Sequence, residues 1–207
     1  VLLGQNAGSV DETAQQVRAA GGTATVLICD VGDADSVAQS AAAAGHVDVL
    51  VNNASFSRAA TLEEVTLADW NAMLAVNLNG YLNCSQAFGR HMLERGKGSL
   101  VHIASISGKE GNAGMLAYST SKAAVIGMAF VFYNVAVQNL TGAWGPREDR
   151  AKNFSTLSLG YSISSFIGPL SVGYIIEYSG HARAYFYLGI STLVAVALPS
   201  SPLFVVI

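Results

Sequence analysis

Charged residues are distributed very unevenly along this chain, and that distribution constrains its fold more than any other feature. They recur throughout the first 127 residues, whereas Glu177 and Arg183 are the only ones after Lys152. Over all 207 residues, 12% are charged and 51% are hydrophobic, which is apolar for a soluble domain. A change of this size within one chain predicts two parts that fold in different environments.

Short apolar runs alternate with longer helical patterns in the first part of the chain. The pattern predicts strands at 1–4, 25–29, 47–51 and 99–103, and helices at 11–20, 33–44, within 66–95 and from about 117. Strands that alternate with helices are typical of βαβ units, whose parallel sheet is buried on both faces. The predicted fold class is therefore α/β, a partial Rossmann-like parallel sheet with flanking helices.

The second part contains two long runs without any charge. Residues 153–176 and 184–207 are 24 residues each, and about 20 apolar residues suffice for a helix to cross a bilayer core. The link 177–183 contains Gly180 and predicts a tight turn. Basic residues before the first run favour a cytoplasmic side for that loop; they are Arg147, Arg150 and Lys152. We expect an all-α hydrophobic segment that lies in the membrane and associates with it through 153–207.

The alternative for the same segment is a pair of very apolar core helices in a soluble protein, because hydrophobicity alone does not distinguish the two.

Composition excludes some classes of function for the first part. The net charge of the whole chain is −3 and there is no basic run, so nucleic-acid binding has no support. Cys29 and Cys84 lie in apolar segments and are expected to be buried free thiols in a reducing compartment. No secretory signal is visible, so we expect this part to be cytoplasmic. The chain opens on Val1 without a methionine, from which we expect a truncated N-terminus. We assign no metal ligand.

Tyr118 and Lys122 form a Tyr-x-x-x-Lys pair on a predicted helix. The spacing of four residues puts both side chains on one helix face. A tyrosine hydroxyl ordinarily titrates near 10, and a nearby ammonium favours the phenolate and lowers that pKa. Such a pair makes proton exchange with a carbonyl or an alcohol feasible near neutral pH.

Several polar residues accompany this pair at the ends of predicted strands or within apolar helices: Asp30 and Val31, Asn53, Asn77, and Ser105, which lies 13 residues before Tyr118. Parallel α/β sheets present functional groups at the carboxyl ends of their strands. Each residue also has a structural interpretation, since Asp30 fits a helix N-cap, Asn77 a satisfied core amide and Ser105 a turn. Their joint order and spacing favour the functional interpretation.

Together these residues resemble the short-chain dehydrogenase/reductase family over about the first 128 residues. The resemblance rests on the CDV and NNA stretches, on Asn77, on the Ser105, Tyr118 and Lys122 spacing, and on YSTSKAAVIGM. It implies an oxidoreductase that uses NAD or NADP and acts on a small carbonyl or alcohol substrate. It also implies an oligomer, since dimers and tetramers are usual in the family.

The resemblance also implies catalytic roles for four residues. Tyr118 would exchange a proton with the substrate oxygen, and Ser105 would hold that oxygen. Lys122 would depress the tyrosine pKa and hydrogen-bond the nicotinamide ribose. Asn77 would hold a water in a proton relay behind Lys122. Tyr118 and Lys122 thus belong to both the catalytic and the cofactor-binding set.

At the other end of the cofactor, the resemblance implies that Asp30 and Val31 flank the adenine and that Asn53 lies along the adenosine ribose. The choice between NAD and NADP stays open, because Gln5 and Asn6 offer neither the acid nor the base that would decide it.

The sequence departs from the family at its beginning. The Gly-x-x-x-Gly-x-Gly turn that approaches the cofactor pyrophosphate does not occur, since Gly4 and Gly8 have a different spacing. Residues 1–4 align better with the second strand of the family, so the first strand, the glycine loop and the first helix are expected to be absent. Two half-sheets with unpaired interior edges would result. Ser55 replaces a glycine in the NNAG turn.

Residues 129–207 resemble a different family, a fragment of a major facilitator superfamily transporter. The resemblance rests on GYSISSFIGPL and on the turn that contains Gly180 and His181. Two helices and a fragment do not form a transport pathway, so no transport residue is assigned. The sequence therefore predicts two domains, 1–128 and 129–207.

Three hypotheses follow for function. The first is an NAD(P)-dependent oxidoreductase of the short-chain type. The second is a membrane protein related to transporters that carries the dehydrogenase part as a passenger. The third is a non-functional chimaeric fusion.

Overall fold

The computed structural model describes the backbone of residues 1–197 and, beyond His181, the side chains of Arg183 and Phe186. The chain divides into two compact units, Val1–Val131 and, within the described part, 132–197. Helix α6 (Leu116–Ala143) contributes to both units and runs through the boundary predicted at residue 128. Each unit is described by itself below.

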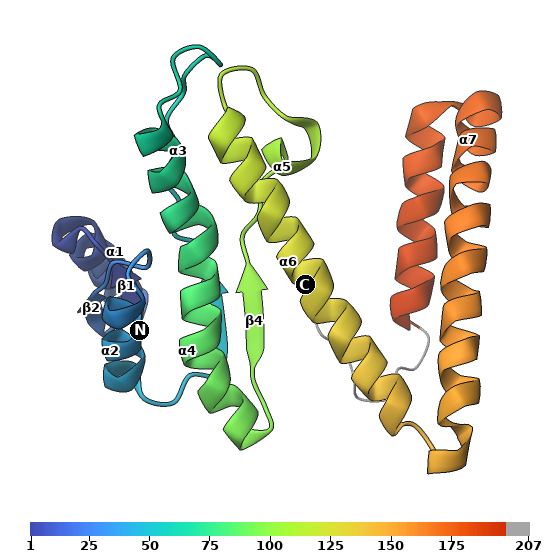
Figure 1. Cartoon of the computed structure of the whole chain (residues 1–207), viewed down its shortest axis with the longest axis horizontal. Helices are drawn as coiled ribbons and strands as arrows, with labels where there is room; N and C mark the ends of the chain where they lie inside the picture. Colours follow the sequence, from blue (N-terminus) through green and yellow to red (C-terminus); the bar gives the residue numbers. More distant parts are fainter. Residues whose placement is uncertain (198–207) are drawn as a thin grey trace. The chain divides into compact units, whose positions relative to one another are not determined.

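The first unit is built from short strands and longer helices in alternation (Figure 1). Its elements are β1 (Leu2–Gly4), α1 (Ala7–Ala19), β2 (Val26–Ile28), α2 (Ala34–Ala44), β3 (Val49–Asn52), α3 (Leu67–Leu74), a π-turn (Ala75–Asn79), α4 (Gly80–Arg95), β4 (Ser99–His102), α5 (Ser107–Glu110) and the first half of α6. The α/β class predicted from the sequence is therefore confirmed for this unit.

The strands form two separate parallel pairs. β1 pairs with β2, with Leu3 opposite Leu27, and β3 pairs with β4, with Leu50 opposite Leu100. Among the described residues, each sheet has only these two strands. The prediction of two half-sheets is confirmed, and each of the strands β1 and β3 keeps one edge without a strand partner in the described part of the chain.

Local side-chain caps explain where the helices begin. Asp33 accepts a hydrogen bond from the backbone N–H of Asp35 and starts α2, as its position predicts. Asn6 caps α1 by accepting from the N–H of Ser9, so this helix begins at Ala7. The predicted start at residue 11 was therefore wrong, because the asparagine cap lies before it.

The long helical pattern predicted within 66–95 is interrupted. Thr66 caps α3, and α3 and α4 are joined by the π-turn that contains Asn77. Since π-turns are rare and costly, they persist mainly where a side chain is held in a particular direction.

The core of the first unit lies where α4 and α2 pack on the strands. Cys84, Phe88 and Met92 recur every four residues along α4 and form one buried face. This face contacts a cluster that includes Cys29 and Leu50. Both cysteines are buried and free, as predicted.

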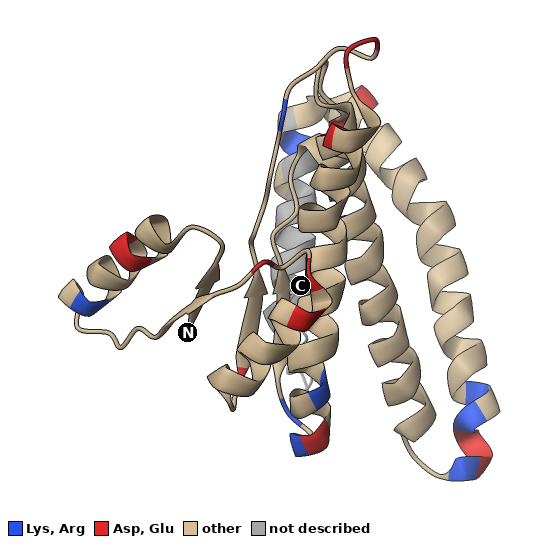
Figure 2. Ribbon diagram, turned by 60° about the vertical axis from the view of Figure 1, so that its left-hand side comes forward, with Lys and Arg blue, Asp and Glu red and all other residues tan. Residues whose placement is uncertain are grey.

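The second unit is a set of long apolar helices. After α6, a short 3₁₀ turn (Arg147–Asp149) leads into α7 (Arg150–Ala197). Gly180 is non-helical, with φ 78° and ψ 164°, and divides α7 inside the predicted turn 177–183. Figure 2 shows the charged residues of this part gathered at the turn before α7, whereas the helices are almost free of charge.

Within residues 1–197, two helices are long and apolar enough to cross a membrane, namely Leu116–Ala143 and Arg147–His181. The predicted run 153–176 lies inside the second of them. The run 184–207 extends to residues 198–207, which lie outside the described part. Leu116–Ala143 was not among the predicted spans, 153–176 and 184–207.

Candidate active site

Tyr118 and Lys122 lie in the first two turns of α6. Lys122 is 1% exposed, and Tyr118 is half-buried. The Nζ of Lys122 lies 5.9 Å from the centroid of the Tyr118 ring. The helix therefore presents both side chains on one face.

The ammonium of Lys122 has two partners inside the first unit. It donates to the hydroxyl of Tyr81 at 3.1 Å and to the backbone carbonyl of Ile103 at 2.9 Å. Burial lowers the pKa of Lys122, because a desolvated ammonium is less stable than a hydrated one. The two oxygens partly offset that cost.

Sequence reasoning missed Tyr81. This tyrosine lies on α4, four residues after Asn77, where an aromatic residue fits the apolar pattern of a core helix. It is 41 residues from Lys122 in sequence, so no spacing rule connects them. Burial raises the pKa of Tyr81 to about 12, and the neighbouring Tyr118 hydroxyl adds to the rise.

Ser105 follows the carboxyl end of β4. Its hydroxyl oxygen accepts a hydrogen bond of 3.2 Å from the N–H of Ser107, at the start of α5. Ser105 thus lies in a turn, as its structural interpretation expected, and it follows the strand whose end carries the Ile103 carbonyl bound by Lys122. Its role toward a substrate oxygen stays a prediction.

Asn77 is completely buried, and its amide is committed to protein partners. The side-chain oxygen accepts from the N–H of Phe56 at 2.7 Å, and the nitrogen donates to the carbonyl of Phe56 at 2.8 Å and to the hydroxyl of Ser121 at 3.0 Å. These bonds tie the loop after β3 to the helix that carries Lys122. This geometry does not test the predicted role of Asn77, which is to hold a water in a proton relay.

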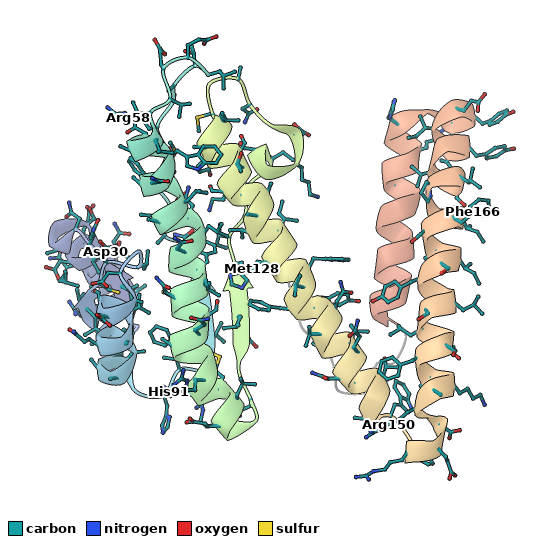
Figure 3. All side chains as sticks on the ribbon, viewed as in Figure 1. Asp30, Arg58, His91, Met128, Arg150 and Phe166 are labelled. Carbon is teal, nitrogen blue, oxygen red and sulfur yellow. The ribbon has the colours of Figure 1, made fainter. Side chains whose placement is uncertain are left out.

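Asp30 and Val31 lie at the carboxyl end of β2. The Asp30 carboxylate accepts from the N–H of Gly32 and from the Gln5 side chain at 2.9 and 2.8 Å (Asp30 is labelled in Figure 3). Since Asp33 is the cap of α2, Asp30 is not the N-cap that the structural interpretation assumed. Val31 packs tightly against Gly80, the first residue of α4.

A cavity of about 630 Å³ opens between the two strand pairs. It is lined by β1 and β3 and by Val31, Asn53, Ala54, Gly80, Tyr81, Cys84 and Phe88, among others. The structure thus brings two predicted cofactor residues, Val31 and Asn53, to one cavity. Asp30, Ser105, Tyr118 and Lys122 are not part of its lining.

A second polar group that sequence reasoning missed adjoins Tyr81. The ring of His102, the last residue of β4, stacks on Tyr81 with centroids 5.7 Å apart. Its Nδ1 is 3.2 Å from the side-chain nitrogen of Asn52, which also donates to Ser85. Burial lowers the pKa of His102. Asn52 and His102 are polar residues at the ends of β3 and β4, and this position in the sequence was the signal that could have identified them.

The first part of the chain is similar to known proteins. The family described as short chain dehydrogenase matches residues 1–136. Gluconate 5-dehydrogenase of Gluconobacter oxydans is 37% identical over 129 residues, which are 60% of this chain and 50% of that protein. D-threitol dehydrogenase of Mycolicibacterium smegmatis is 36% identical over 154 residues, 72% of this chain and 56% of that protein. The chain spans about half the length of the curated relatives it matches.

Solved structures share the fold. The NAD+-bound xylitol dehydrogenase has a TM-score of 0.59 at 30% identity and is similar over 61% of this chain and 51% of its own. A short-chain dehydrogenase/reductase from Burkholderia phymatum in complex with NAD has a TM-score of 0.61 at 29% identity, over 64% and 49%. A gluconate 5-dehydrogenase from Burkholderia cenocepacia in complex with NADP and tartrate has 0.55 at 28%, over 69% and 55%.

Proposed function

The chain belongs to the short-chain dehydrogenase family, and from this premise we propose that it is an NAD(P)-dependent oxidoreductase that interconverts a carbonyl and an alcohol. One observation carries the proposal. The buried ammonium of Lys122 is anchored beside the ring of Tyr118, and its carbonyl anchor, Ile103, lies two residues before Ser105. Ammonium, phenol and hydroxyl are the groups that carbonyl reduction needs at one place.

The proposed roles follow from what each side chain exchanges. In reduction, the Tyr118 hydroxyl gives its proton to the substrate oxygen, and in oxidation it takes that proton back. The hydroxyl of Ser105 donates a hydrogen bond to the same oxygen. The Lys122 ammonium offsets the negative charge left on the tyrosine oxygen. When bound, the nicotinamide supplies or accepts the hydride at the substrate carbon, so that one hydride and one proton account for the change.

The proposed cofactor is NAD or NADP, and the described residues fit it in part. Val31 and Asn53 line one cavity and suit an adenosine, as Asp30 does beside them. Lys122 keeps one ammonium hydrogen for a ribose hydroxyl, because an ammonium has three donors and two are used. The described residues contain no Gly-x-x-x-Gly-x-Gly turn for the pyrophosphate. We therefore expect these 207 residues to bind the cofactor more weakly than a protein that carries such a turn.

Titration of the purified 207-residue chain with NADH and with NADPH, followed by nicotinamide fluorescence, tests cofactor binding. The wild type should change the fluorescence at millimolar cofactor, and Asn53→Asp should weaken binding because it adds a negative charge beside an anion. Asn79→Asp is the matched control, since this exposed residue lies outside the cavity lining. A wild type without any signal for either cofactor would contradict the proposal.

Turnover tests the chemistry separately from binding. Gluconate, threitol and xylitol are suitable first substrates, because proteins named for these polyols are similar to this chain. Tyr118→Phe should retain cofactor binding and lower turnover by about 100-fold or more, since it removes the proton donor. Equal turnover in wild type and Tyr118→Phe would rule out the assigned role.

A specific observation favours a second function for residues 132–197, membrane association. Large apolar side chains are exposed along the part of α7 from Phe154 to Tyr178, and Phe166, labelled in Figure 3, is 71% exposed. Exposed apolar patches of this extent mark contact with lipid or protein. The transporter resemblance of 129–207 and the chimaeric origin stay predictions.

Cell fractionation with a matched pair of variants tests membrane insertion. Leu170→Lys, at a position 59% exposed, should move the chain from the membrane fraction toward the soluble or aggregated fraction. Leu62→Lys makes the same change at a position 72% exposed in the first unit and should have no such effect. Recovery of the wild type from the cytosol without detergent would contradict the proposal.

The localisation and assembly proposed with these functions are a cytoplasmic first unit, a membrane-embedded second unit and an oligomer. Light scattering of the detergent-solubilised chain, corrected for bound detergent, measures the number of subunits directly.

A further inference from the structure

The position of Lys122 is determined by two oxygen atoms that belong to other elements. Its Nζ donates to the Tyr81 hydroxyl of α4 at 3.1 Å and to the carbonyl of Ile103, just after β4, at 2.9 Å. The Nζ also lies 5.1 Å from the centroid of the Tyr81 ring. A four-carbon side chain has many rotamers, so a single defined position requires partners of this kind.

Tyr81 is itself fixed on both sides. Its ring stacks on His102, and its hydroxyl donates to the carbonyl of Ile103 at 3.0 Å. Only 1% of its surface is exposed, and the two contacts come from different sides of the ring. Burial raises its pKa to about 12, so the phenol is neutral at physiological pH and its oxygen can accept from Lys122 while its proton goes to Ile103.

The hydroxyl of Tyr81 is not needed for packing. A phenylalanine at this position would fill the same space and stack on the same imidazole. What the oxygen adds is a second acceptor for a buried ammonium, and unpaired buried charges are costly. Substitution of Tyr81 by phenylalanine therefore removes its hydrogen bonds and keeps its apolar contacts.

We propose that Tyr81 is a positioning residue, whose hydroxyl acts together with the Ile103 carbonyl to hold the ammonium of Lys122 beside Tyr118 and to direct its third N–H outward. The positioning of Lys122 rests on the hydrogen bonds alone. Its consequence for catalysis rests also on the proposed dehydrogenase function. Tyr81 does not touch the reacting atoms, and it acts through Lys122.

Removal of the Tyr81 hydroxyl leaves Lys122 with one oxygen acceptor in the first unit. Loss of this hydrogen bond destabilises the ammonium form of Lys122 more than the neutral amine. The pKa of Lys122 therefore falls. Two other titratable groups lie beside the pair and contribute to the electrostatics of the site: Tyr118 on α6 and His102 on β4.

Nuclear magnetic resonance of the whole chain labelled with carbon-13 at lysine Cε tests the geometry without cofactor or substrate. The chain has four lysines, of which Lys97, Lys109 and Lys152 are exposed, so the buried Lys122 gives the distinct signal. Lys122→Met assigns that signal. In Tyr81→Phe the titration midpoint of Lys122 should fall by about one pKa unit. An unchanged midpoint in a variant with the wild-type circular dichroism would overturn the proposal.

If Tyr81→Phe does not fold, a second measurement on the wild type tests the same contact. Nuclear Overhauser contacts should connect the ε protons of Lys122 with the ring protons of Tyr81, and the absence of these contacts would overturn the proposal.

Kinetics then tests the consequence. In an active chain Tyr81→Phe should lower kcat about tenfold with little change in KM, because substrate does not touch Tyr81. An unchanged kcat together with a shifted Lys122 midpoint would refute the effect on catalysis while the geometry stands. An inactive wild type that shows the Lys122 shift would instead refute the dehydrogenase proposal for this chain.

Discussion

The side-chain nitrogen of Asn77 donates a hydrogen bond of 3.0 Å to the hydroxyl of Ser121, 44 residues later in the sequence. Both residues are completely buried. Because Ser121 precedes Lys122 directly, this bond fixes the turn of α6 that carries the candidate lysine to the π-turn between α3 and α4.

Asn77→Ala should lower the free energy of unfolding by about 2 to 4 kcal/mol, because the N–H and carbonyl of Phe56 and the Ser121 hydroxyl all lose a partner. Urea denaturation followed by circular dichroism measures the change. Asn79→Ala alters the same residue type two positions later at an exposed site, and its effect should stay below about 1 kcal/mol. Similar losses in the two variants would show that the buried bonds are unimportant.

Gly80→Ala should destabilise the first unit. A methyl group at this position would lie 2.7 Å from Val31 Cγ2 and 3.0 Å from its Cβ, and valine cannot rotate away from both contacts. We expect a loss of about 1 to 3 kcal/mol, reduced by the better helix propensity of alanine. The measurement is the urea midpoint.

Gly89→Ala is the internal control on the same helix, since nothing lies within 4 Å of a methyl group there. This variant should be stabilised by up to about 1 kcal/mol. Two changes of the same sign and size would contradict the close approach of α4 to Val31.

The stability of the first unit should decrease as the pH falls below about 6.5, the ordinary pKa of histidine. Burial lowers the pKa of His102 in the folded chain, so between its folded and unfolded pKa values the unfolded chain binds more protons and is favoured. The contribution is fully present above about 6.5 and is lost as the pH falls through the lowered value.

Urea midpoints between about pH 8 and pH 5 measure this dependence. The acid-side slope should be smaller in His102→Gln than in the wild type, because the variant has no group that titrates at this position. Parallel curves would mean that His102 is already accessible to protons in the folded state.

The two thiols should be unreactive in the folded chain. Cys29 and Cys84 are buried, and burial, with a smaller contribution from the charge of Cys29, raises the pKa of Cys84 to about 12. Since the thiolate is the reactive form, an aromatic disulfide reagent near pH 8 should release colour only after urea is added. Rapid stoichiometric release without denaturant would contradict the buried positions.

Local signals in the sequence predicted where helices and strands begin better than they predicted the contacts between distant residues. The start of α2 was predicted correctly because the cap, Asp33, is adjacent to the helix that it begins. The same kind of signal was available at Asn6 for α1. Gly8 and Ser9 follow this cap, and their low helix propensity makes the start of α1 hard to recognise in the sequence.

Contacts between distant residues were beyond sequence reasoning. The spacing of Tyr118 and Lys122 predicts a shared helix face, but it does not say which oxygens surround the ammonium. Tyr81 and Ile103 enter that environment only because α4 and β4 pack beside α6. The commitment of the Asn77 amide to Phe56 likewise depends on where a loop folds back.

The two strand edges beside the 630 Å³ cavity have a consequence for how this chain behaves in solution. Val49 and Val51 are exposed on β3, and the backbone groups on the open side of a strand bond readily to another extended chain. Such association is second order in protein, whereas folding is first order. Dilution therefore favours folding over aggregation, and the yield of refolding should rise as the protein is diluted.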